Sequence, residues 1–202
     1  MPVIETSAAL LALTALLAYL LGSVPFGLVM ARAFGLGDIR AIGSGNIGAT
    51  NVLRTGKKPA AALTLILDAG KGAAAVLIAR AMLTGDAAQL AGLMAFLGHC
   101  FPVFLGFKGG KGVATFLGTL LALFWPAGIA ACLTWVLVAA VSRISSLSAL
   151  VAAALTPVWI SVLGMPQAWV VTALLAAVIF LRHGANIKRL LNGEEPRIGA
   201  KG

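Results

Sequence analysis

Long apolar runs, separated by short polar stretches rich in glycine, dominate the pattern of this chain. A helix needs about 20 predominantly apolar residues to cross a bilayer. Stretches near that length cover residues 7–30, 60–83, 86–107, 147–164 and 166–181. The pattern therefore predicts an all-α integral membrane protein, and residues 1–202 contain no linker or repeat that would divide them into more than one transmembrane domain.

The stretch 113–141 allows two interpretations, because Pro126 and Gly128 interrupt it. It could form one long tilted helix, or two helices of about 12 to 15 residues joined within 125–128. If it crosses twice, every Lys and Arg except Arg80 falls on one side, as the positive-inside rule requires. We therefore expect seven transmembrane helices, two of them short, with the N-terminus outside and the C-terminus in the cytoplasm.

Composition narrows the function classes. Hydrophobic residues make up 60% of the chain and charged residues only 10%, which excludes an ordinary soluble domain. The net charge of +9 is typical of basic cytoplasmic loops or anionic ligands in a membrane protein, so membrane lipids are expected partners and nucleic acid is not. Six scattered carboxylates argue against a bound metal, and we expect no cofactor.

The first polar cluster runs from Asp38 to Arg54 and contains glycines in the spacing G-x-G-x-x-G. That spacing indicates dinucleotide binding only between a strand and a helix, and no parallel sheet is expected here. Bare backbone N–H groups, polar donors and the fixed charge of Arg54 instead favour an anion site over a plain connector. The candidate residues are Gly43, Ser44, Gly45, Asn46, Thr50, Asn51 and Arg54.

A second cluster, residues 98–115, places glycines around two lysines immediately before a helix that we expect to begin near Val113. Free N–H groups at a helix N-terminus, beside mobile ammonium groups, suit a phosphate. A basic loop that touches anionic lipid would explain the lysines but not the glycines between them. The candidates are Lys108, Gly109, Gly110, Lys111 and Gly112.

Further candidates lie near the ends of other predicted spans. His183 and Asn186 are three residues apart, so they could share a helix face and point into one site, with Ser146 as an inward hydroxyl from another loop. Asp68 and Lys71, one turn apart inside a predicted span, form either a structural ion pair or a device that positions a substrate hydroxyl or the glycine-rich loops.

These clusters, in this order, resemble the bacterial acyl-phosphate:glycerol-3-phosphate acyltransferases of the PlsY family. The matching pieces are Asp38 to Asn51 with Arg54, Asp68-x-x-Lys71-Gly72, Gly98 to Thr115, Ser145-Ser146-Leu147, and Arg182-His183-x-x-Asn186-Ile187-x-Arg189 with Gly193 and Glu195. The resemblance covers nearly the whole chain. It implies seven membrane helices in the bacterial plasma (inner) membrane, an active site that faces the cytoplasm, and transfer of a fatty acyl group from acyl phosphate to the sn-1 hydroxyl of glycerol 3-phosphate.

The resemblance also suggests roles and a partner. Ser44, Arg54, Lys108, Lys111 and the amides of 109–112 would hold phosphates, while Ser146, His183 and Asn186 would orient glycerol 3-phosphate. The base is either His183 or a phosphate oxygen of the donor. An enzyme that supplies acyl phosphate is a further possible partner. The competing class is a membrane transporter for a small phosphate-containing anion, which would require polar groups near the bilayer midplane.

Overall fold

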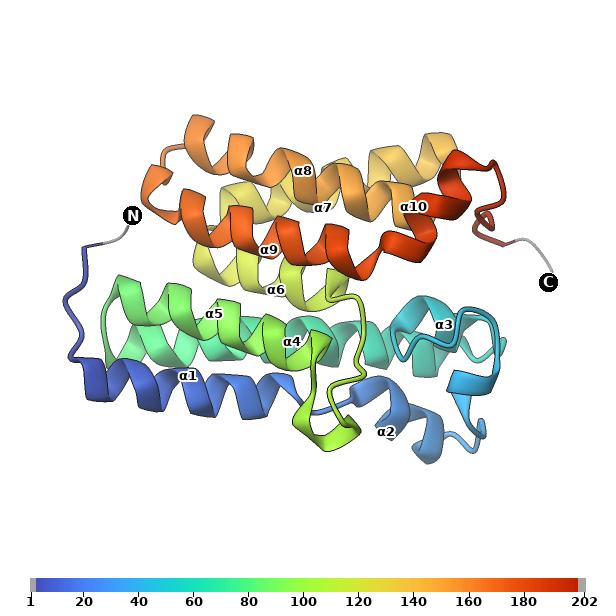
Figure 1. Cartoon of the computed structure of the whole chain (residues 1–202), viewed down its shortest axis with the longest axis horizontal. Coiled ribbons are helices and arrows are strands. Elements are labelled where there is room, and N and C mark those ends of the chain that lie inside the picture. Colours follow the sequence, from blue (N-terminus) through green and yellow to red (C-terminus); the bar gives the residue numbers. More distant parts are fainter. Residues whose placement is uncertain (1–2, 200–202) are drawn as a thin grey trace.

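The computed structural model describes residues 3–199, and those residues form a helical bundle without strands (Figure 1). Lys201, the last cation of the chain, lies outside the described residues. The first half contains α1 (Ala8–Gly22), α2 (Phe26–Ala33), α3 (Ala49–Leu53), α4 (Lys58–Met82) and α5 (Gly85–Cys100). The second half contains α6 (Val113–Leu123), α7 (Trp125–Ser142), α8 (Ser145–Val162), α9 (Trp169–Arg182) and α10 (Gly184–Leu191).

Five segments of this bundle are long and apolar enough to cross a membrane. They are Ala8–Ala33, Lys58–Met82, Gly85–Leu105, Trp125–Ser142 and Ser145–Val162. Pro166–Arg182 and Gly184–Leu191 make a sixth if this pair, bent by 64°, counts as one span. The chain is therefore a multi-pass membrane protein, as the sequence predicts.

The ambiguous stretch does form two helices, but their lengths and their junction differ from the prediction. The break falls at Phe124, and the two helices contain 11 and 18 residues, so only α6 is short. Pro126 lies in the first turn of α7, where its missing N–H costs no hydrogen bond, so it starts this helix instead of separating the two. A side chain at Gly128 would come within 2.6 Å of the Leu121 backbone, and glycine therefore allows α6 and α7 to pack closely.

The first predicted span, 7–30, is also interrupted. Helix α1 ends at Gly22 and α2 begins at Phe26, with Pro25 between them. Pro25 restricts the backbone of the residue before it to extended conformations, which ends the first helix. Carbonyl oxygens released at this break are available to other partners, and the backbone oxygen of Val24 accepts a hydrogen bond from Lys71 Nζ at 2.8 Å.

Small residues set the distances between the central helices. A side chain at Gly118 of α6 would lie 2.0 Å from the backbone oxygen of Ala69, and one at Gly72 of α4 would lie 2.6 Å from that of Thr115. Backbones that approach this closely are typical of helix packing in membranes, where small residues allow extensive van der Waals contact. The close crossing of α4 and α6 fixes the position of α6 and therefore the point where the loop before it ends.

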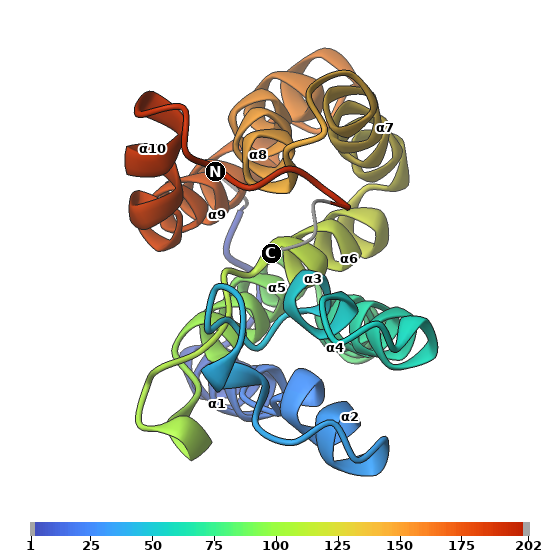
Figure 2. The same ribbon diagram turned by 90° about the vertical axis from the view of Figure 1, so that its right-hand side faces the viewer.

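Consecutive long helices run in opposite directions, so the polar loops gather at one end of the bundle, which we call the site end (right in Figure 1). Viewed onto that end, α1 to α5 lie on one side and α7 to α10 on the other, with α6 between them (Figure 2). The polar clusters singled out in the sequence therefore lie together at the site end. The exception is the pair Asp68 and Lys71, which lies within α4.

Candidate functional site

A lysine from one half of the molecule contacts an asparagine from the other half at the site end. Lys111 Nζ donates a hydrogen bond to Asn186 Oδ1 at 2.6 Å. Lys111 lies in the loop before α6, whereas Asn186 is buried on α10, 75 positions away in the chain. This contact brings together two of the sequence clusters.

The loop that carries Lys111, residues 106–112, is called the glycine loop. Three of its four glycines, Gly109, Gly110 and Gly112, are required sterically. Gly112 caps α6 with φ +87°, and a side chain there would collide with the ring of Phe96. A side chain at Gly110 would lie 2.1 Å from His99 Nε2. The Gly110 N–H donates to the His99 backbone oxygen at 3.1 Å. Glycine therefore lets the backbone lie directly against α5.

Arg182, at the end of α9, holds this loop from the other half of the molecule. Its Nη2 donates to the Gly109 oxygen at 2.8 Å, and its Nε donates to the Gly110 oxygen at 3.1 Å. The guanidinium also lies over the Phe101 ring, 5.3 Å from the centroid. Arginine suits this position because its planar fork can bind two acceptors while it stacks on an aromatic ring.

A carboxylate completes what we call the polar network, which consists of Lys111, Ser146, Asn186, Arg189 and Glu195. Glu195 Oε1 accepts hydrogen bonds from Ser146 Oγ at 2.7 Å and from Asn186 Nδ2 at 2.5 Å. Its Oε2 accepts from Arg189 Nε at 2.7 Å. These hydrogen bonds lower the pKa of Glu195 even though burial raises it, so Glu195 is ionised at neutral pH.

His183 lies just beyond the end of α9, at the bend before α10, and its side chain is buried. Its Nδ1 is 2.8 Å from the backbone oxygen of Ile179, so Nδ1 carries the hydrogen and Nε2 is left as an acceptor. Burial lowers the pKa of His183 to about 4, which makes the ring neutral at physiological pH. His183 is the N-cap residue of α10, its backbone oxygen accepts from the Ile187 N–H at 2.8 Å, and both His183 and Asn186 are buried at the site end.

The first cluster folds around Asn51, which is buried. Its Oδ1 accepts hydrogen bonds from the Ser44 N–H at 3.2 Å and from Arg54 Nη1 at 3.3 Å, and its Nδ2 donates to the Ile39 oxygen at 2.7 Å. Gly43 has φ +54°, and a side chain there would collide with Asn51 and Arg54. Asn51 thus fixes the position of Arg54.

The pKa of Lys111 depends on its burial and on the charged residues around it. Its pKa is lowered to about 8, first by burial and then by Arg189, Arg54 and Arg182, while Glu195 raises it. Three arginines therefore act on Lys111 against one carboxylate in the part of the chain that the structure describes. An excess of positive charge in a partly buried pocket favours the binding of an anion.

Asp68 and Lys71 form the ion pair that was one of the two interpretations of their spacing. Lys71 Nζ is 2.8 Å from Asp68 Oδ1, and both side chains are buried. His99 Nδ1 lies 3.4 Å from the same carboxylate oxygen. Because His99 also contacts Gly110, the pair is connected to the glycine loop through a single side chain.

The structure separates the remaining candidates by exposure. Lys108, Ser44 and Thr50 are exposed, and among residues 3–199 their side chains make no hydrogen bond to the polar network. Gly45 is in the left-handed region, and Asn46 Oδ1 accepts from the Ile47 N–H at 2.9 Å. Lys111 is therefore the lysine of the glycine loop that enters the site.

Three residues of the site belong to the motif that carries the family resemblance but were given no role from the sequence: Arg182, Arg189 and Glu195. All three belong to the last polar cluster, where a run of cations is usually a solvated face. The signal that could have identified them is Glu195 itself, because a carboxylate shortly after a basic helix offers those cations an ionic partner.

Comparison with known proteins agrees with this geometry. A family model described as glycerol-3-phosphate acyltransferase matches residues 12–193. A protein of Jannaschia sp. (strain CCS1) with that name is 72% identical over 198 residues, which is 98% of each chain. One from Ruegeria sp. (strain TM1040) is 68% identical over 201 residues and covers all of both chains.

Two solved structures share the fold. Both are of PlsY (YgiH), an integral membrane glycerol 3-phosphate acyltransferase, in its glycerol 3-phosphate form and its lysophosphatidic acid form. The first has a TM-score of 0.88, is 40% identical and covers 94% of this chain and 96% of that chain. The second has a TM-score of 0.87, is 38% identical and covers 94% and 95%.

A helical bundle in the membrane with a cationic, glycine-lined site at one end defines a membrane protein that handles an anion. The chain belongs to the glycerol-3-phosphate acyltransferase family, and it is a membrane acyltransferase of that kind.

The charge of Lys111 predicts the alkaline limit of activity. Because its pKa is about 8, the ammonium is lost as the pH rises through that value, and kcat/KM should fall with it. Glu195→Gln removes the carboxylate that raises this pKa, so the alkaline midpoint should move to lower pH. Asp38→Asn, which changes an exposed carboxylate paired with Arg40, is the control and should leave the midpoint in place.

The measurement is the pH profile of acyltransferase kcat/KM for the unmutated protein and both variants. Thermal melts would verify that each variant is folded. A midpoint that stays fixed or moves upward in Glu195→Gln would contradict the assignment of Lys111 as the titrating group.

Proposed function

We propose that this protein transfers a fatty acyl group from acyl phosphate to the sn-1 hydroxyl of glycerol 3-phosphate, giving 1-acyl-glycerol 3-phosphate and inorganic phosphate. The observation that carries the proposal is the excess of arginine charge around Lys111, beside a buried neutral histidine and hydroxyl. The two named forms of the PlsY structures, with glycerol 3-phosphate and with lysophosphatidic acid, support it, because these molecules are an acceptor and a product of such a transfer.

Both proposed substrates carry a phosphate, and the site has cations for both. Arg54 and Lys111, with Ser44 and the glycine loop, would bind phosphate oxygens. Fixed cations in a partly buried pocket stabilise negative charge that develops on the leaving phosphate and on the tetrahedral oxyanion. Because Lys111 enters the polar network whereas Lys108 is exposed, we assign the contact with a reacting phosphate to Lys111.

The hydroxyl that attacks would be oriented by His183, Ser146 and Asn186. His183 Nε2 is an acceptor, and it can receive the hydrogen bond of a glycerol hydroxyl. A pKa of about 4 makes His183 a weak proton acceptor at neutral pH, whereas the phosphate of the donor gains negative charge and basicity as its bond to the acyl carbon breaks. We therefore assign proton removal to the donor phosphate and orientation to His183.

The step then balances without a covalent enzyme intermediate. The glycerol oxygen forms an ester bond with the acyl carbon, the bond from that carbon to the phosphate oxygen breaks, and the hydroxyl proton leaves with the phosphate. Acyl phosphate is a mixed anhydride with a good leaving group, so proximity and charge stabilisation supply what the reaction needs. A second enzyme that produces acyl phosphate is the partner that this chemistry requires.

For the membrane arrangement we propose seven crossings in the bacterial inner membrane, with the N-terminus outside and the site end in the cytoplasm. Helix α6, with 11 residues, reaches about 17 Å of a core about 30 Å thick. The bilayer would be thinner there, or the junction at Phe124 would lie below its surface. The cations at the site end support a cytoplasmic orientation through the positive-inside rule.

Removal of one phosphate-binding cation should abolish most of the transfer. Arg54→Ala and Lys111→Ala should each lower kcat/KM by about a hundredfold or more, the scale seen when a group that stabilises transition-state charge is removed. The assay supplies acyl phosphate and glycerol 3-phosphate to purified protein in lipid, and it measures released phosphate together with acylated product. Lys57→Ala removes an exposed cation on the same face and serves as the control.

Unchanged kinetics in both variants would remove the proposed phosphate contacts. Passage of phosphate across the membrane without acyl transfer would instead support the transporter alternative.

The orientation can be tested by sided labelling. In a background in which Cys100 and Cys132 are replaced by alanine, single cysteines are placed at Lys57, Lys188 and Met82. A membrane-impermeant thiol reagent added to intact cells should label Met82→Cys at once, and it should label Lys57→Cys and Lys188→Cys only after the membrane is opened. Labelling of Lys57→Cys and Lys188→Cys from opposite sides would contradict the arrangement.

A further inference from the structure

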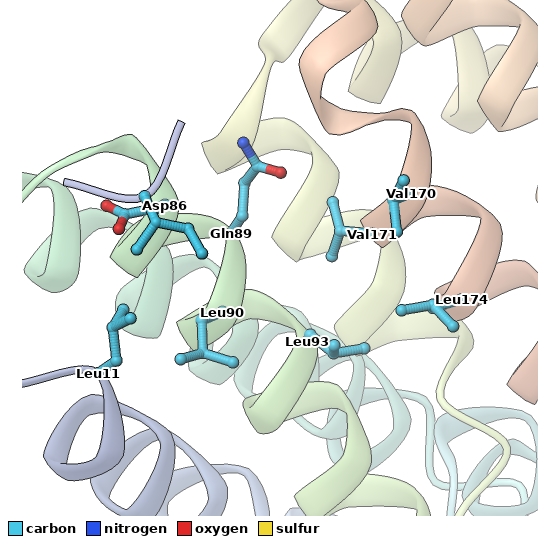
Figure 3. A pocket seen from close by; sticks show the side chains of 9 residues that line it. Leu11, Asp86, Gln89, Leu90, Leu93, Val170, Val171 and Leu174 are labelled. Atoms are coloured by element: carbon cyan, nitrogen blue, oxygen red, sulfur yellow. The ribbon is translucent and has the colours of Figure 1, made fainter. Parts of the chain in front are cut away.

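An apolar cavity lies at the opposite end of the bundle from the polar network. Its volume is about 270 Å³, and it lies between α5, α9 and the N-terminal segment (Figure 3). Figure 3 shows Leu93 of α5 toward Leu174 of α9 and the Gln89 amide toward Val171, with Leu90 on the side of Leu11. Nothing in the proposed reaction uses this cavity directly.

Gln89 is the unusual residue of this cavity. Its side chain is 5% exposed, and it makes no hydrogen bond to any residue in the range 3–199. The amide lines the cavity, where water can reach it, and covering it without a partner in apolar surroundings would be costly. The other polar residue, Asp86, is fully engaged, because its oxygens accept from the N–H groups of Glu5, Thr6 and Ala87 and from the hydroxyls of Thr6 and Thr84.

The contacts of Asp86 also explain why the cavity ends where it does. They hold the segment before α1 against the first turn of α5, and Ile4 of that segment lines the cavity. The end of the cavity is therefore a fixed wall.

Two apolar stripes connect this cavity with the site. On α5, Leu90, Leu93, Leu97 and Phe101 recur at helical spacing. On α9, Val170, Leu174, Val178 and Arg182 recur every fourth residue. Leu93, Leu97, Phe101 and Val178 are partly buried around one core cluster, and the stripes meet at the site end, where Arg182 covers the Phe101 ring and binds the glycine loop.

The length of this path fits one acyl chain. The 12 residues from Gln89 to Phe101 span about 18 Å at 1.5 Å per residue, while the acyl chains of one leaflet span about 15 Å, half of the hydrocarbon core. We infer that the apolar stripes of α5 and α9 hold the acyl chain of the acyl phosphate between them, and that the cavity with Gln89 receives its far end and limits its length.

This inference rests on the proposed function and deepens it. The physical basis of the limit is the amide of Gln89. A chain short of the cavity leaves Gln89 accessible to water, whereas a longer chain displaces that water and leaves the amide without any partner. Chains that reach Gln89 are therefore disfavoured relative to chains that stop before it.

The test is kcat/KM for a homologous series of saturated acyl phosphates of increasing length. Gln89→Leu keeps the volume and removes the amide, so it should raise the ratio of long-chain to short-chain kcat/KM by about tenfold, the scale of one apolar group in a pocket. Leu174→Trp fills the cavity and should lower the same ratio by about tenfold. Leu133→Trp makes the same change at an exposed leucine of α7 and should leave the ratio unchanged.

Short-chain turnover reports whether each variant is folded, and if one variant is inactive with every chain, the ratio in the other decides. Identical chain-length profiles in the unmutated protein, Gln89→Leu and Leu174→Trp would overturn the inference and leave the cavity to an ordinary membrane lipid. Failure of the proposed function would give a different result from failure of this inference. In that case the unmutated protein would transfer no acyl group from acyl phosphate of any length.

Discussion

The contact between Lys111 and Asn186 is the interaction on which the rest of the site depends. It places the half-buried ammonium of Lys111 near Arg54, Arg182 and Arg189. These arginines lower the pKa of Lys111, whereas the ionised Glu195 raises it. Burying a cation is unfavourable unless an opposite charge compensates it. The folded site therefore has positive charge in excess, which favours the binding of an anion such as the phosphate of the proposed substrates.

Close helix packing holds the residues that carry this excess of positive charge in place. Gly118 and Gly72 let α4 and α6 cross closely, and Gly112 starts α6 at the point where Lys111 must emerge. The bend after α9 turns His183 and Asn186 toward the site. Each position would be lost if a larger residue forced the backbones apart.

The sequence predicts the helices well because apolar length and the distribution of cations are strong signals in a membrane. The division of 113–141 into two helices was predicted from charge alone. The junction at Phe124 was not, since Pro126 was expected to separate helices and instead begins one. The pairing of Asp68 with Lys71 was predictable from their spacing within one helix.

The composition of the site was harder to predict. Glu195, Arg182 and Arg189 contact the site because the chain bends after α9 and returns. A carboxylate after a basic helix indicates an ion pair, but it does not specify which residues of other helices the pair will contact. The difference between Lys108 and Lys111 depends in the same way on tertiary contact, because both lysines have glycine neighbours in the sequence.

A double-mutant cycle between Lys111 and Asn186 tests the central claim most directly. The measured quantity is kcat/KM for Lys111→Met, Asn186→Ala and the double variant, with melting temperatures to verify folding. If the two residues act as one unit across the two halves, the double variant should lose about as much activity as the more damaging single variant. Losses that multiply would show two independent residues and would contradict the account.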